Sequence, residues 1–124
     1  MNELNDVHNK IVELEKEISD KKTQCDQYII KYNNLLISYI KNTYSSVWII
    51  KATPSKPISP VKNACIFLSY LEASQHMPKN NSTFDYDCSC RWTYEIIETD
   101  INKLSDDEII NIGKIPIDYP YYGW

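Results

Sequence analysis

Apolar residues recur at alternating intervals of three and four along the first third of this chain. With Leu4 at heptad position a, every following a or d position up to Tyr39 falls on the same stripe, and Lys21 is its one plainly polar member. Such a repeat is typical of a coiled-coil seam, which packs against another helix. The other stripe residues are Leu4, Val7, Ile11, Leu14, Ile18, Cys25, Tyr28, Tyr32, Leu35 and Tyr39. We therefore expect residues 1–44 to form one long helix that associates with copies of itself, as a dimer or a trimer.

Charged residues beside the stripe favour a parallel orientation of these helices. In a parallel pair, Lys10 would face Glu15 of the partner subunit, and Glu17 would face Lys22 of the partner subunit. The alternative to self-association is that this long helix folds back and packs on the rest of its own chain.

The stripe widens from Tyr28 onward, where apolar residues also occupy other faces of the helix. A wider apolar surface predicts a second packing partner, most simply the protein's own globular part. On this reading, Tyr32 and Leu35 belong to the wall on which that part packs. The added apolar residues are Ile29, Ile30, Leu36, Ile37 and Ile40.

Residues 45–124 change to a period of two and are expected to form a small domain with about three antiparallel strands. Residues 47–52 and 63–71 are predicted strands, the second apolar on both faces and therefore expected at the centre of the sheet. The three prolines between them predict a stiff, extended connection. Residues 88–97 alternate between apolar and polar types, as in a half-buried antiparallel strand. Residues 73–84 are expected to form a loop.

The last part of the chain carries the signals of one short helix. Ser105 followed by Glu108 fits a capping box, and Gly113 supplies a stop, so we expect a helix at 106–112. Residues 115–124 are too apolar for a solvated terminus and should pack on the fold or on a neighbouring subunit. The predicted fold class is thus α+β: a long N-terminal helix, a small sheet, a short helix and an aromatic tail.

Composition points to the origin of the chain more than to its chemistry. It holds eighteen isoleucines, eleven asparagines and ten tyrosines but a single arginine, the pattern of a low-GC genome such as that of a virus, phage or mobile element. The N-terminus lacks the basic and apolar regions of a signal peptide, and no apolar run is long enough to span a bilayer. We therefore expect an intracellular protein that is not secreted, in the host cytoplasm or the virion if viral, with no membrane contact.

The four cysteines raise the question of a metal site. Cys65, His76, Cys88 and Cys90 together would supply thiolate and imidazole ligands suited to zinc. Their spacing departs from the usual knuckle, however, because a Cys-x-Cys pair replaces Cys-x₂₋₄-Cys. Small buried hydrophobic residues are the simpler interpretation of these cysteines, and we expect no cofactor.

A basic middle segment suggests a possible site for anions. Residues 41–82 carry five lysines against the single acid Glu72, whereas residues 83–124 carry nine acids. Pairing between these two regions is the simpler explanation, and neither region has the strong basic excess that is typical of nucleic-acid binding. The residues that could bind an anion or a nucleotide are Lys51, Lys56, Lys62, Arg91 and Trp92.

Catalytic residues in a recognisable arrangement are missing from the sequence. A Cys–His pair needs an oxyanion hole, and both glycines lie near the C-terminus. We expect a non-enzymatic assembly or interaction protein whose coiled coil presents repeated binding surfaces to a further protein partner. The alternative is an oligomeric module that binds a nucleotide or another anionic ligand at a subunit interface.

Overall fold

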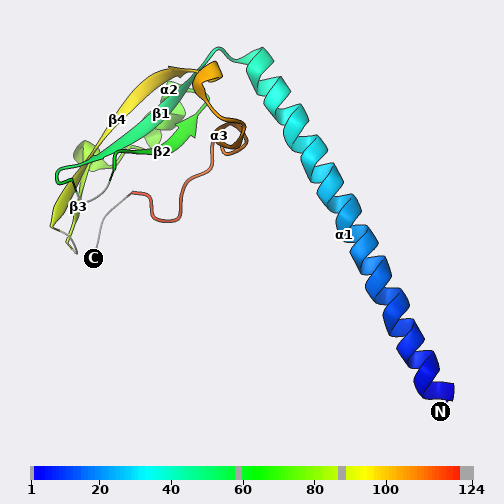
Figure 1. Ribbon diagram of the computed structural model, residues 1–124. Coiled ribbons are helices and arrows are strands. Elements are labelled where there is room, and N and C mark those ends of the chain that lie inside the picture. The colour runs from blue at the N-terminus through cyan, green and yellow to red at the C-terminus, as the bar shows by residue number, and fades with distance from the viewer. Residues whose placement is uncertain (1, 58–59, 87–88, 121–124) are drawn as a thin grey trace. The chain divides into compact units, whose positions relative to one another are not determined.

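A computed structural model describes residues 2–57, 60–86 and 89–120 of this protein. A long helix, α1 (Asn2–Thr43), precedes a four-stranded sheet with short helices (Figure 1). The chain divides into two compact units, one up to Leu36 and one from Ile37 onward. The last turns of α1 therefore belong to the second unit.

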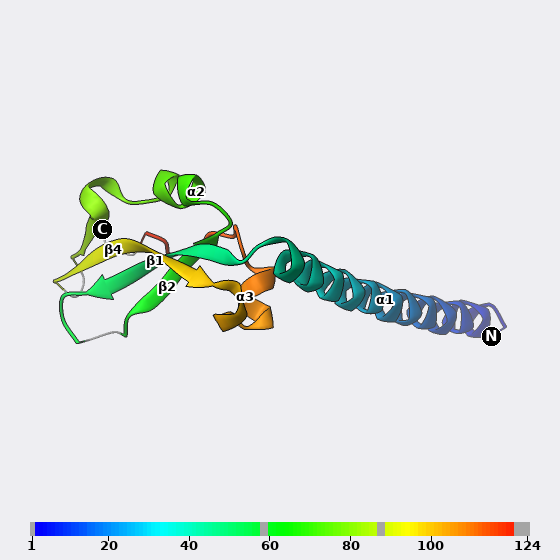
Figure 2. The same ribbon diagram turned by 90° about the horizontal axis from the view of Figure 1, so that it is seen from above.

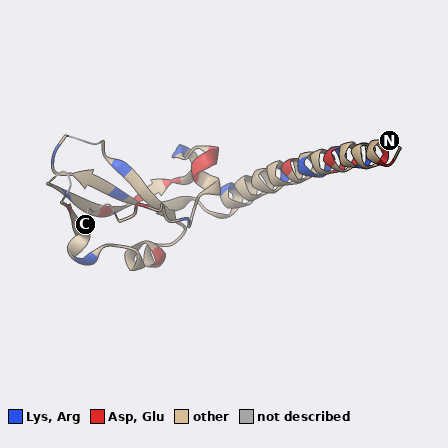
Figure 3. Cartoon of the chain, turned by 90° about the horizontal axis from the view of Figure 1, so that it is seen from below, with Lys and Arg blue, Asp and Glu red and all other residues tan. Residues whose placement is uncertain are grey.

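Helix α1 is confirmed over the predicted range. No proline or glycine occurs before Pro54, so nothing in the sequence interrupts the backbone hydrogen bonds of the helix. Figure 3 shows acidic and basic residues interspersed along the N-terminal half of α1, with few charged residues in the half that follows. The N-terminal half of α1 thus has a narrow apolar stripe, and most of its other positions are charged or polar.

The α+β fold class is confirmed, with four strands where about three were expected. All pairings are antiparallel, and the order across the sheet is β2-β1-β4-β3. The fourth strand comes from the predicted loop, because residues 82–85 pair with the beginning of β4 at the edge of the sheet. The strands are β1 (Ser46–Pro54), β2 (Lys62–Phe67), β3 (Ser82–Asp85) and β4 (Cys90–Asp100).

Strand β2 differs from its prediction in length and in position. It ends at Phe67 because the Ser69 hydroxyl accepts a 3.2 Å hydrogen bond from the Glu72 amide and starts helix α2 (Tyr70–Gln75). It also lies at the edge of the sheet, so the prediction of a central strand is wrong. Its residues 64–67 are nevertheless buried. Cys65 and Phe67 lie in the core together with Ala73 of α2, and the segment after β4 reaches the strand where the Gly113 amide donates to the Ile66 carbonyl at 2.7 Å.

The main core lies on the face of the sheet that α2 covers. Ile50, Phe67, Trp92 and Tyr94 are buried there together with Ala73 of α2. The predicted alternation of β4 is confirmed over its described part, since Cys90, Trp92 and Tyr94 are buried and the residues between them are exposed. Cys88, also expected on this face, lies outside the described residues.

A second, smaller core lies on the opposite face. Figure 2 shows α2 and α3 (Asp106–Ile110) on opposite faces of the sheet. By the alternation along β1, Val47 and Ile49 point away from α2, and both are buried. Ile101, Leu104 and Ile109, which follow β4, are buried as well, as expected if they cover this second face.

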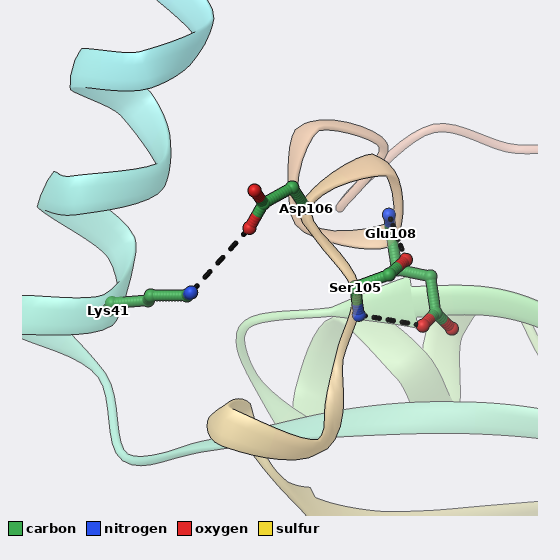
Figure 4. A network of polar contacts seen from close by, with 4 residues as sticks. All are labelled: Lys41, Ser105, Asp106 and Glu108. Atoms are coloured by element: carbon green, nitrogen blue, oxygen red, sulfur yellow. Dashed lines mark hydrogen bonds and ion pairs between the residues drawn. The ribbon is translucent and has the colours of Figure 1, made fainter.

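The predicted capping box forms at the start of α3. The Ser105 hydroxyl accepts a 3.2 Å hydrogen bond from the Glu108 amide, and the Glu108 carboxylate accepts a 3.0 Å hydrogen bond from the Ser105 amide (Figure 4). The regular helix ends at Ile110, and the turn continues to Gly113, which has a positive φ of 83°. In the same region Lys41 forms a 3.6 Å ion pair with Asp106.

Candidate self-association surface

The apolar stripe of α1 is exposed along its whole length. Its large apolar members range in exposure from 44% at Leu14 to 71% at Tyr28. Cys25 is exposed as well. Solvent-facing Leu, Ile and Tyr residues in a continuous row are typical of a surface that binds another protein. All ten predicted interface residues therefore lie on one accessible row of the helix.

The polar flanks of this stripe are also open to a partner. Lys10 contacts Glu13 of its own helix at 3.5 Å, but both side chains are about two-thirds exposed. An exposed pair of this kind contributes little to stability. The Lys10 ammonium can therefore leave Glu13 and form an ion pair with a carboxylate on another helix.

The boundary in α1 between exposed stripe residues and residues buried in the second unit differs from the predicted one. Ile40 is buried at 5% exposure within the second unit, whereas Ile29 and Ile30 are exposed. Tyr32 and Leu35 were expected to form part of the wall for the globular part, but they are 63% and 62% exposed. The residue of α1 that is buried in the second unit is Ile40, which directly follows the stripe residue Tyr39.

The five residues of the predicted anion site are not brought together. Lys62 and Trp92 share the α2 face, where the Lys62 ammonium lies 5.5 Å from the Trp92 ring centroid. Lys51 and Arg91 belong to the opposite face by the alternation along their strands. Lys56 lies beyond the end of β1. No single ligand-sized surface gathers these cations among the described residues.

Arg91 instead has partners on its own face of the sheet. Its guanidinium donates a 3.1 Å hydrogen bond to the Ser82 hydroxyl and lies 5.6 Å from the Phe84 ring centroid. These contacts join strand β4 to strand β3.

Cys65, His76 and Cys90, the zinc candidates that the structure describes, are likewise separated. Cys65 pairs with Ile50 in the middle of β1, whereas Cys90 lies at the far end of the sheet, opposite Asp85. His76 stacks on the Phe67 ring at 4.7 Å, and its Nδ1 lies 2.8 Å from the Glu72 carbonyl oxygen. No group of three or more potential metal ligands occurs within the described ranges.

The two buried thiols have different environments. Burial raises the pKa of Cys65 from its usual 9.0 to about 11. Burial acts in the same direction on Cys90, but hydrogen bonds from Ser55 and Lys56 and the charge of Lys56 outweigh it, so the pKa of Cys90 is lowered. The Cys90 sulfur lies 3.6 Å from the Ser55 hydroxyl.

Sequence reasoning missed α2, although a signal for it was present. Ser69 and Glu72 have the same Ser-x-x-Glu spacing as the recognised capping box at Ser105. The segment that holds His76 against Phe67 could therefore have been predicted as helical.

Comparison with known proteins yields no relative. No known protein family, no curated protein and no solved structure matches this sequence. In the described part of the chain, no helix combines the length and apolarity needed to cross a membrane. The exposed stripe of α1 is thus the feature that bears most directly on function.

Proposed function

We propose that this protein is a non-enzymatic assembly or interaction protein that associates with itself through α1 and presents its second unit in several copies. The observation that carries the proposal is the exposure of the entire apolar stripe between Leu4 and Tyr39. The composition supports an origin in a low-GC virus, phage or mobile element. A further protein partner would bind the repeated second units.

Burial of the stripe would supply the stability that the first unit lacks alone. Residues 2–36 consist of one helix, and helices in water depend on packing of an apolar face more than on intrinsic propensity. Fully burying a leucine or isoleucine side chain contributes about 1.5–3 kcal/mol. Leu4, Val7, Ile11, Leu14 and Ile18 of each chain would all gain in this way.

The test is the solution mass of the full chain, measured by light scattering coupled to size exclusion. Ile11 and Val12 offer a matched pair, since they are adjacent β-branched residues that are 48% and 52% exposed, and only Ile11 lies on the stripe. Ile11→Asp should convert the oligomer to monomer, because it places a charge in the buried seam. Val12→Asp should leave the mass unchanged.

Two results would count against self-association. A full-length protein that stays monomeric at about 100 μM would contradict it directly, because any dimer would then bind with less than about 5.5 kcal/mol. Equal effects of Ile11→Asp and Val12→Asp would show that the stripe is not the interface.

Binding of an anionic ligand has less support. The candidate cations do not converge on one ligand, because Lys62 lies on the α2 face of the sheet and Lys51 and Arg91 lie on the opposite face. A ligand-induced thermal shift with a nucleotide such as ATP would favour this alternative. The assembly proposal predicts no shift.

A further inference from the structure

We infer that the second copy packs on α1 parallel to the first and in register, so that both chains enter their second units at the same end of the coiled coil. This inference rests on the proposed self-association. It concerns the orientation and the alignment of the two helices. The residues beside the stripe are exposed along the N-terminal half of α1, where a partner helix can reach them.

Charge complementarity is complete in the parallel arrangement. With Leu4 at position a, each g residue faces the e residue of the next heptad on the partner. Lys10 then faces Glu15 of the partner subunit, and Glu17 faces Lys22 of the partner subunit. Symmetry doubles each contact, which gives four attractive pairs and no repulsive one at these positions.

The antiparallel arrangement loses this advantage. Two antiparallel alignments overlap the stripe equally, and in both g residues face g residues and e residues face e residues. The first alignment sets Ile11 beside Tyr28 of the partner subunit. Lys10 meets Lys31 of the partner subunit, which is repulsive, while Glu15 meets Lys22 of the partner subunit, which is attractive. These two kinds of contact cancel.

In the second alignment, which sets Ile18 beside Tyr28 of the partner subunit, Glu17 meets Lys31 of the partner subunit twice by symmetry, and Lys22 meets its own copy once. Both alignments have fewer net attractive contacts than the four of the parallel form, so charge favours the parallel form.

Lys21 fixes the register of the two helices. It is the one plainly polar residue of the stripe, and a single polar core position selects register at some cost in stability. In the parallel, in-register form both lysines share one layer, from which their long side chains can reach water. A slip by one heptad would place each lysine in an apolar layer, against Leu14 or Tyr28.

Cys25 gives the orientation a chemical readout. It occupies position a and is exposed, so in the parallel form it faces its own copy, at a separation that a disulfide can bridge. In the antiparallel alignment that sets Ile11 beside Tyr28 of the partner subunit, it lies beside Leu14 of the partner subunit. The two copies of Cys25 would then be roughly 16 Å apart, given eleven residues at 1.5 Å each.

The experiment uses the full-length Leu14→Cys variant, which can cross-link in either orientation. After mild oxidation and trypsin digestion, mass spectrometry identifies which positions are joined, since Lys16, Lys21 and Lys22 place positions 14 and 25 in different peptides. We expect links from 14 to 14 and from 25 to 25. Links mainly from 14 to 25, or no links in a sample that is oligomeric, would overturn the parallel in-register form.

Controls separate this result from a failure of the proposed function. The unmodified protein should give a cross-linked dimer that Cys25→Ser abolishes, and Val12→Cys placed in the Cys25→Ser chain should give none, because position 12 lies off the stripe. Light scattering on the reduced sample reports association itself. A monomeric reduced sample overturns both proposals, whereas an oligomer with links from 14 to 25 overturns only the orientation.

Discussion

The phenol of Tyr119 donates a 2.6 Å hydrogen bond to the backbone carbonyl of His76, 43 positions earlier in the chain. The same ring meets Tyr94 edge to face, with ring centroids 5.8 Å apart. These contacts place Tyr119 on the face of the sheet that α2 covers, beside the main core. The prediction that the aromatic tail packs on its own fold is thereby confirmed at Tyr119, whereas Ile115 and Ile117 of the same tail are exposed.

Removal of the Tyr119 hydroxyl should have a small effect and removal of the ring a larger one. Tyr119→Phe loses one hydrogen bond, so we expect the free energy of unfolding to fall by about 0.5–1.5 kcal/mol. Tyr119→Ala also loses ring packing on the core and should cost about 3 kcal/mol. Urea denaturation measures both values. A Tyr119→Ala protein as stable as the wild type would show that the tail is not part of the core.

The position of Ile40 predicts where α1 changes from an association surface to a core element. Ile40→Ala should lower the free energy of unfolding of the second unit by about 2–4 kcal/mol, because it leaves a cavity. Leu35→Ala is the matched control, since Leu35 is exposed and should affect only the oligomer mass. Tryptophan fluorescence follows unfolding, and light scattering follows mass. Equal loss of unfolding free energy in both variants would contradict this division.

The capping box at α3 should contribute measurably to stability. Ser105→Ala removes the side-chain acceptor of the Glu108 amide, and loss of such a cap costs about 1 kcal/mol. Glu108→Gln retains an oxygen that can accept from the Ser105 amide, so its effect should be smaller. Thermal unfolding compares the two variants. A larger loss from Glu108→Gln would argue that charge, rather than capping, is the main contribution of Glu108.

The raised pKa of Cys65 predicts a loss of stability in alkaline solution. The folded protein holds the thiol proton more tightly than the unfolded chain does, so the contribution is complete below pH 9.0 and declines as the pH rises towards about 11. Cys65→Ala should therefore show a shallower fall in unfolding free energy across this range than the wild type. Urea denaturation at a series of pH values tests this, and identical slopes would contradict it.

Much of the secondary structure was predictable because it depends on local patterns. The heptad stripe gave α1 to within a few residues, and alternation gave β1 and most of β4. Strand β3 could not be predicted, since its four residues gain their pairing from β4 and carry little pattern of their own. The stripe residues could be predicted to share one row of α1, because this follows from their spacing. The proposed cation cluster could not be tested from spacing, because it depends on which face of the sheet each residue occupies.

By itself, the sequence determined a long α1 with a polar-flanked apolar stripe, a capped α3 and a half-buried β4, because each follows from spacing along the chain. The tertiary structure decided that β2 lies at the edge of the sheet, that Lys62 and Arg91 face opposite sides, and that Ile40 is buried while Leu35 is exposed. Strand order and contacts between distant segments fix these outcomes. The periodicity of a segment reports which of its faces is apolar, but not which neighbour covers that face.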